Sequence, residues 1–332
     1  MTDFIILLII ATAVVFVIRY RAKREADGSS CCLGCASAEN GCSSCRAGGG
    51  LADRMNSVPV PEKKVDYSEK KIVFFDIDGT IVDGPTHQIP ESTVRAVRRL
   101  QENGHLAFIN TGRTLVSIER RIRDIGFDGF VCGCGTHIYY EGKVLYACSI
   151  PHEKCVEIIK KLREFKIPAF FEAPDTVYYD SRCASPELSQ SVSNFQSVGS
   201  NVKDFPEDLE NGQFTFDKFF CLFKEDSDVE GLEEYIRDDF TGTPQGTGHL
   251  EVVPKGRSKA EGIRFLQETF GIRLDNCYAI GDSENDIPML EAVPNSIAMG
   301  TCSPLILPHC SYHTDKVMED GIEKALVHYG LI

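Results

Sequence analysis

Basic residues are scarce in this sequence relative to acidic ones. Its 332 residues include 35 lysines and arginines against 49 aspartates and glutamates, which gives a formal net charge of -14 at pH 7. Nucleic-acid backbones bind clustered Lys and Arg, so we expect no nucleic-acid partner. Small phosphorylated ligands remain compatible with this charge, because a bound metal ion reverses the field locally. The 42 % of apolar residues suffices for a core, and the length predicts two folded units.

Basic residues are also absent in front of the long apolar run near the N-terminus. Residues 4–18 carry no charge, and four bases follow within residues 19–24. A cleaved signal peptide carries its bases first, so this order favours a membrane anchor at residues 1–24 with the rest of the chain in the cytoplasm. At roughly 15 residues the run is short for a transmembrane helix, so whether it spans the membrane stays open.

Cysteine is concentrated in the predicted flexible linker that follows, residues 25–66. Two C-x-x-C pairs occur there, and they offer four thiolates to Zn²⁺ or another thiophilic metal: Cys32, Cys35, Cys42 and Cys45. Composition alone equally supports a flexible linker with reactive or palmitoylated thiols. The other scattered cysteines lie in apolar runs, which is typical of reduced, buried thiols rather than of a disulfide framework.

The first 45 residues resemble the small cysteine-rich membrane proteins associated with FeoB. These have a hydrophobic N-terminal helix, a basic stop and a tail rich in Gly, Ser and Cys. The resemblance implies an association with iron transport.

The first β-favouring run of the downstream chain ends in two carboxylates. Residues 71–75 are mostly apolar and lead into Asp76, Asp78 and Gly79, as in a central parallel strand at its carboxyl end, where open α/β sheets bind ligands. Alternation places Asp76 and Asp78 on the same side. Two such charges about 4 Å apart repel by about 4 kcal/mol at an effective dielectric near 20, so a site with more than two carboxylates requires a cation or a proton. We expect the cation to be Mg²⁺.

Two further apolar runs end in residues that suit phosphate and metal binding. Residues 106–110 lead into Thr111 and Gly112, whose hydroxyl and backbone N–H groups suit phosphate oxygens. Residues 277–281 lead into a loop with three oxygen donors of the kind that Mg²⁺ prefers: Asp282, Asn285 and Asp286.

A lysine lies at the start of an amphipathic helix with Ser258 as its N-cap. Lys259 therefore lies near a helix N-terminus, a position that attracts anions. Lys255 competes with it for the same role, but it precedes Gly256 in a turn where a solvated lysine is ordinary. We favour Lys259.

This ordered set of motifs resembles the haloacid dehalogenase (HAD) superfamily, and more narrowly its Cof-type IIB branch, over residues 70–332. The resemblance implies an α/β, Rossmann-like core with a parallel sheet and an inserted α+β cap of the C2B type. It implies a Mg²⁺-dependent phosphatase that hydrolyses a sugar phosphate or cofactor phosphate ester through an aspartyl-phosphate.

The resemblance also implies residue roles. Asp76 is the nucleophile, Asp78 is the general acid/base, the metal site is Asp76, Asp78, Asp282 and Asp286, and the phosphate site is Thr111, Gly112, Lys259 and Asn285. Simpler alternatives stay open: Thr111 only ends a strand, Arg113 only pairs with a carboxylate, and Asn285 only caps its loop.

The stretch between the second strand and Lys259 is too long for a loop inside a compact domain. We therefore predict a core at residues 67–149 and 249–332 with a cap at 150–248. The cap pattern predicts helices at 152–165 and 228–240 and strands at 169–172, 177–180 and 214–224. Residues 181–209 are expected to be a cap insertion or a mobile loop.

One departure from the family and two alternative functions remain. Many relatives carry Asn-Gly after the third core strand, whereas this chain has Cys134-Gly135, so an amide contact to substrate is missing. A phosphomutase would use the same aspartate. From another class, the chain would be a membrane accessory that handles iron or another metal, with the cysteine cluster as its functional centre.

Overall fold

We describe a computed structural model of the chain, in which residues 66–332 are described. The predicted anchor at residues 1–24 and the cysteine pairs formed by Cys32, Cys35, Cys42 and Cys45 lie outside these residues. From residue 66 onward, none of the helices combines the length and apolar character needed to cross a bilayer.

The larger of two sheets has eight strands in the order β14-β13-β12-β1-β2-β3-β4-β5. Its strands are β1 (Ile72–Phe75), β2 (Leu106–Asn110), β3 (Gly129–Cys132), β4 (His137–Tyr140), β5 (Lys143–Ala147), β12 (Cys277–Gly281), β13 (Asn295–Ala298) and β14 (Tyr312–His313). The strands from β14 to β3 pair in parallel, and β4 and β5 add an antiparallel edge. The predicted Rossmann-like parallel sheet is confirmed.

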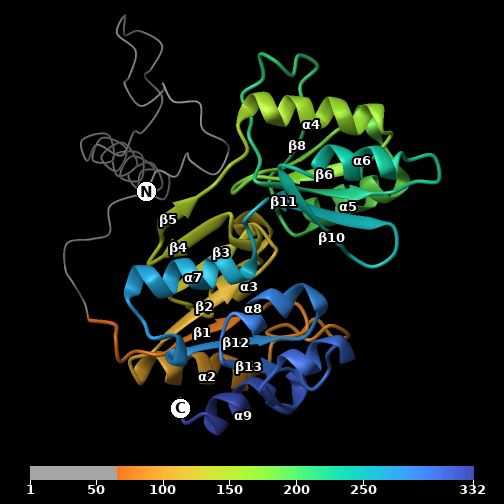
Figure 1. The fold of residues 1–332 in the computed structure, drawn as a ribbon. Helices are drawn as coiled ribbons and strands as arrows, with labels where there is room; N and C mark the ends of the chain where they lie inside the picture. Colours follow the sequence, from red (N-terminus) through yellow and green to blue (C-terminus); the bar gives the residue numbers. More distant parts are fainter. Residues whose placement is uncertain (1–65) are drawn as a thin grey trace, which may run out of the picture. The chain divides into compact units, whose positions relative to one another are not determined.

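Helices cover both faces of this sheet, as Figure 1 shows. They are α2 (Glu91–Glu102), α3 (Arg120–Arg123), α7 (Lys259–Phe270), α8 (Ile287–Glu291) and α9 (Gly321–His328). Val73 and Phe75 pack with α2 and α9 on one face, and Ile72 and Phe74 pack with α7 and α8 on the other. The four residues of β1 are fully buried, which explains why an uninterrupted apolar run forms the centre of the sheet.

The smaller sheet has six strands in the order β10-β11-β9-β6-β7-β8 and is antiparallel except between β7 and β8. Its elements are α4 (His152–Glu164), β6 (Ala169–Glu172), β7 (Val177–Tyr179), α5 (Pro186–Ser197), β8 (Val202–Asp204), β9 (Lys218–Leu222), α6 (Val229–Ile236), β10 (Phe240–Pro244) and β11 (His249–Pro254). We call these elements the cap. It extends to Pro254 rather than to the predicted boundary at residue 248, because β11 pairs with β10 and β9 of the smaller sheet. Phe171, Phe219 and Cys221 pack under α4 and α6, so the opposite sheet face is left for other contacts.

Three further cap predictions differ from the structure. The strand predicted to begin at residue 214 begins at Lys218. The helix predicted to reach residue 240 ends at Ile236, and Phe240 is instead the first residue of β10. The segment 181–209 is not a mobile loop, because it contains α5 and β8. The Ser185 hydroxyl accepts a hydrogen bond from the Leu188 N–H at 3.0 Å and caps α5.

Cysteines within residues 66–332 form no disulfide. All nine of them are free, and four are buried. This agrees with the expectation that the folded part of the chain is not held by a disulfide framework.

Candidate active site

Three carboxylates meet at the carboxyl ends of two neighbouring parallel strands. Asp76 follows β1 and Asp282 follows β12, and the pairing of Phe75 with Ile280 brings the two ends together. Asp286 lies four residues further, in a short 3₁₀ turn. One oxygen from each of the three carboxylates lies within 4.8 Å of the others. The structure therefore brings together Asp76, Asp282 and Asp286.

A glycine allows this close approach. Gly79 has a φ of +84°, and a Cβ atom there would lie 2.2 Å from the Asp282 Oδ2 atom. Only glycine fits both the left-handed backbone and the space. The turn after β1 therefore admits the carboxylate that follows β12.

Lys259 connects two of the carboxylates. Its Nζ atom donates to Asp76 Oδ1 at 2.6 Å and to Asp286 Oδ1 at 2.5 Å, and all three side chains are buried. The helix start is built as expected, because the Ser258 hydroxyl accepts a hydrogen bond from the Glu261 N–H at 3.2 Å. Lys255, the competing lysine, is exposed.

Two carboxylates in this group have raised pKa values, chiefly because they are buried and in part because other carboxylates lie beside them. Burial raises the pKa of Asp76 to about 7 although Lys259 opposes it. Burial, together with the charges of Asp76 and Asp286, raises the pKa of Asp282 to about 8. One ammonium group cannot balance three ionised carboxylates, whereas a divalent cation restores neutrality. The oxygen-only donor set suits Mg²⁺.

The Asp78 carboxylate stands apart from this group. Its side chain is 60 % exposed and forms a two-point ion pair with Arg113, whose Nε and Nη2 atoms lie 2.9 and 2.5 Å from the two Asp78 oxygens. The Asp78 side chain is therefore not among the three carboxylates that the structure brings together, and its expected role as a metal ligand stays a prediction. The turn at Gly79 bends the chain away from strand alternation, and Arg113 supplies the partner.

Three of the four expected phosphate-binding residues, Thr111, Gly112 and Asn285, line one cavity of about 470 Å³ together with Asp76 and Asp78. Lys259 does not line this cavity, but it contacts Asp76, which does. Thr111 is buried at the end of β2, with Gly112 beside it, and Asn285 lies in the loop after β12. The Asn285 Oδ1 atom accepts a hydrogen bond from the Ser283 hydroxyl at 2.7 Å. The structure therefore brings these residues to the same cavity as the nucleophile candidate.

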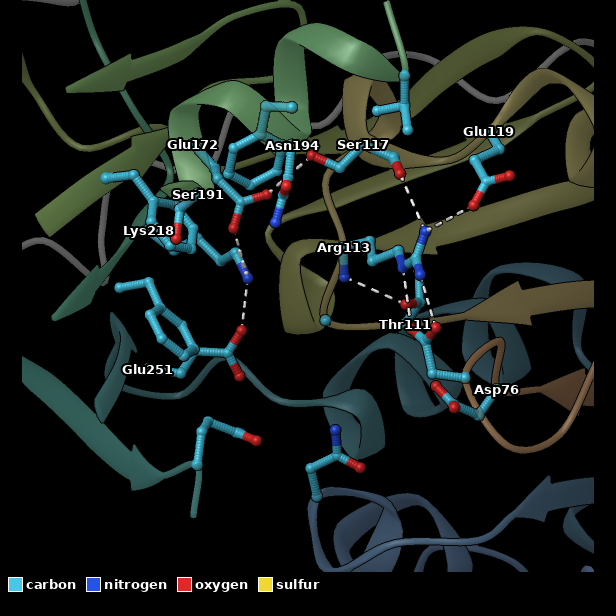
Figure 2. Close-up of a pocket in the computed structure, with 18 of the residues that line it drawn as sticks. Asp76, Thr111, Arg113, Ser117, Glu119, Glu172, Ser191, Asn194, Lys218 and Glu251 are labelled. Atoms are coloured by element: carbon cyan, nitrogen blue, oxygen red, sulfur yellow. Dashed lines mark hydrogen bonds and ion pairs between the residues drawn. The ribbon is translucent and has the colours of Figure 1, made fainter. Parts of the chain in front are cut away.

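Sequence reasoning missed the cap side of this cavity. Three charged residues line it: Glu172, Lys218 and Glu251. Lys218 forms an ion pair with each of the two glutamates (Figure 2), and we call the three residues the cap ionic cluster. Helix α5 also contributes to the cavity wall, through Asn194 and Phe195 among others. A signal was present in the sequence, because Glu251 lies within an otherwise apolar strand, and Glu172 and Lys218 lie at the ends of two others.

The fold and the site define a hydrolase of the HAD type, and comparison with known proteins agrees. Residues 73–326 match the family of haloacid dehalogenase-like hydrolases, and the chain belongs to this family.

Among curated relatives, YkrA of Bacillus subtilis (strain 168), a phosphatase by name, is 31 % identical over 272 residues, which cover 80 % of this chain and 99 % of YkrA. YcsE of the same organism, a 5-amino-6-(5-phospho-D-ribitylamino)uracil phosphatase, is 25 % identical over 79 % of this chain and 96 % of its own. The solved structure of BT4131, described as a HAD subclass IIB sugar phosphatase, matches with a TM-score of 0.66 and 26 % identity over 79 % of this chain and 100 % of that one. The expectation of a phosphatase enzyme is confirmed.

Proposed function

We propose that the chain is a Mg²⁺-dependent phosphatase that hydrolyses a small phosphorylated metabolite through an aspartyl-phosphate on Asp76. The observation that carries the proposal is the meeting of Asp76, Asp282 and Asp286 with Lys259 beside a cavity that also contains Thr111. Buried carboxylates in excess of the local positive charge are typical of a site that is completed by a cation.

Residues of the chain carry out each step of the proposed mechanism. Asp76 attacks phosphorus, and Lys259 holds one of its oxygens so that the other remains free for attack. Thr111 and Lys259 bind equatorial phosphate oxygens. Asp78 protonates the leaving oxygen and then takes a proton from the water that hydrolyses the aspartyl-phosphate. Arg113 holds Asp78 at the rim until substrate enters.

Asp76, Asp282 and Asp286 would hold the metal ion. Bound Mg²⁺ supplies neutralisation of the charge that develops on the transferring phosphoryl group.

The substrate class is inferred from relatives and from the cavity. BT4131 is described as a sugar phosphatase, and YcsE acts on a ribityl-uracil phosphate. A cavity of about 470 Å³ accepts ligands of this size. We therefore propose a sugar phosphate or a cofactor phosphate ester as the substrate.

Phosphate release from a panel of such esters tests this function in the full-length protein. We expect turnover with Mg²⁺ and none after addition of EDTA. Turnover that requires a sugar bisphosphate activator would instead indicate a phosphomutase. No release from any ester with Mg²⁺ would contradict the proposal.

A further inference from the structure

One face of the cap sheet is polar where it meets the cavity. Glu172 on β6 is registered opposite Lys218 on β9, and Glu251 on β11 is registered opposite Phe220. Strand alternation turns these side chains to the face opposite the one that packs under α4 and α6. All three members of the cap ionic cluster are more than nine-tenths buried and line the cavity.

Both carboxylate oxygens of Glu172 already have hydrogen-bond or ion-pair partners. Its Oε1 atom lies 2.9 Å from Lys218 Nζ, and its Oε2 atom accepts from the Thr114 hydroxyl at 3.0 Å and the Ser117 hydroxyl at 3.2 Å. Glu172 therefore holds the cap against the loop that follows Arg113. It has little capacity left for a ligand.

Glu251, in contrast to Glu172, has one carboxylate oxygen without a strong hydrogen-bond donor within residues 66–332. One of its oxygens accepts from Lys218, and within residues 66–332 the other has only the Cys134 thiol, at 3.5 Å. A thiol is a weak donor. A Cβ atom at Gly112 would lie 3.2 Å from Glu251 Oε1, so this carboxylate faces the loop that carries Thr111. Glu251 thus has acceptor capacity at the place where a bound ester leaves the phosphate site.

The cap ionic cluster carries one net negative charge. Burial acts to raise the pKa of Glu251, but the Lys218 ammonium outweighs it and holds that pKa below its ordinary value. Burial acts to lower the pKa of Lys218, and Glu172 and Glu251 raise it above the ordinary lysine value. Two carboxylates against one ammonium favour a hydrogen-bond donor on the ligand and disfavour a second phosphate.

An aromatic wall adjoins the cluster. The Phe170 and Phe220 rings stack at 5.0 Å with an interplanar angle of 10°, and Phe195 of α5 meets Phe170 edge-on at 5.1 Å. All three line the cavity. Such a surface suits the face of a ring.

We propose that Glu251, supported by Lys218, is a specificity-determining site that selects a ring-bearing phosphate monoester with a hydroxyl or amino group to donate to Glu251. The inference rests on the proposed phosphatase function and names its substrate class. It excludes esters that place a second phosphate against the cap.

Two substitutions test the site in the full-length protein. Glu251→Gln removes the charge, and Cys134→Asn gives Glu251 a strong internal donor in place of the thiol. Asparagine tolerates the left-handed backbone at position 134, where φ is 54°. Glu164→Gln on α4 is the control, because that side chain is 62 % exposed and, among residues 66–332, its one ion pair is with Lys161.

Three probe esters provide the readout: phenyl phosphate, which lacks a donor, 4-aminophenyl phosphate and glucose 6-phosphate. The wild-type protein should have a higher kcat/KM for at least one donor-bearing ester than for phenyl phosphate, and which one it prefers distinguishes amine from hydroxyl recognition. Both test variants should lower that preference by roughly 10- to 100-fold, the effect of a hydrogen bond to a charged group. The control should keep it.

The inference is overturned if both test variants keep the wild-type preference, or if they lower kcat/KM equally for all three esters, as a purely structural role would. It is also overturned if the wild-type protein hydrolyses phenyl phosphate with no preference for the other two. Failure of the wild-type protein to hydrolyse any of the three or any ester of the metabolite panel would instead contradict the proposed function.

Discussion

Lys259 stabilises the folded chain in the absence of a metal ion, because its ammonium group partly neutralises two buried carboxylates. It donates to both Asp76 and Asp286 while being almost fully buried. Replacing Lys259 by Met leaves those charges without a partner, and removal of one member of a buried ion pair costs about 3 to 5 kcal/mol. In EDTA, urea unfolding of Lys259→Met should show a loss in this range.

The matched control for this change is the neighbouring lysine. Lys255 is exposed and makes no ion pair within the described part of the chain. Lys255→Met should therefore unfold like the unaltered protein, and equal losses in both variants would contradict the assigned role of Lys259.

Asp282 has the opposite effect on stability when metal is absent. Its pKa is raised to about 8 by burial and by the neighbouring carboxylates. A raised folded-state pKa gives stability that is present below the unfolded-state value near 4 and is lost as the pH rises through about 8. In EDTA, Asp282→Asn should therefore have a higher Tm than the unaltered protein at pH 8, with a smaller difference at pH 5.

Mg²⁺ should reverse that order. It should raise the Tm of the unaltered protein and leave Asp282→Asn nearly unchanged, because the variant lacks a ligand. Thermal scans at both pH values measure this, and an equal Mg²⁺ response in the two proteins would rule out Asp282 as a ligand.

At the scale of elements, parallel strands made the site predictable. The apolar runs before Asp76 and Asp282 indicated strands, and their carboxyl ends meet because β1 and β12 pair in parallel. The bend at Gly79 does not follow from alternation. The alternative that Arg113 pairs with a carboxylate agrees with the structure, but the sequence did not identify Asp78 as that carboxylate.

The cap was less predictable than the core for a physical reason. Its site residues are single charged side chains on strands whose other face is apolar, and their partners come from strands distant in sequence. The register of Glu172 with Lys218 depends on tertiary pairing. Helix α5 was missed because its polar, Ser-rich sequence resembles a loop, although Ser185 and Pro186 mark its start.

The turn after β1 gives a prediction at this scale. Gly79→Ala places a Cβ atom 2.2 Å from Asp282 Oδ2 in a left-handed backbone. The strain should cost about 2 kcal/mol in urea unfolding, and displacement of Asp282 should weaken the Mg²⁺-induced rise in Tm. Gly84→Ala is the control, since a Cβ atom there would meet no atom within 4 Å in the part of the chain that the structure describes. Equal behaviour of the two variants would contradict the close approach of the two loops.

At the scale of the whole chain, we propose that the apolar residues 4–18 tether a cytoplasmic enzyme to the membrane. The support is the sequence alone, in which the bases follow the apolar run. The full-length chain should sediment with membranes after cell lysis, and a chain without residues 1–66 should stay in the supernatant with the same rate of phosphate release. If both chains stayed in the supernatant, the proposed membrane anchor would be wrong. A full-length chain that binds Zn²⁺ or iron at the cysteines and releases no phosphate would favour a function centred on the cysteines.

The central claim is that Asp76 becomes phosphorylated during turnover. The direct measurement is mass spectrometry of the full-length protein after rapid acid quenching with Mg²⁺ and a substrate ester. We predict the added mass of one phosphoryl group on the peptide that contains Asp76, its removal by hydroxylamine, and its absence in Asp76→Asn, whose kcat should fall roughly a thousandfold or more. Turnover by Asp76→Asn at the unaltered rate would contradict the account.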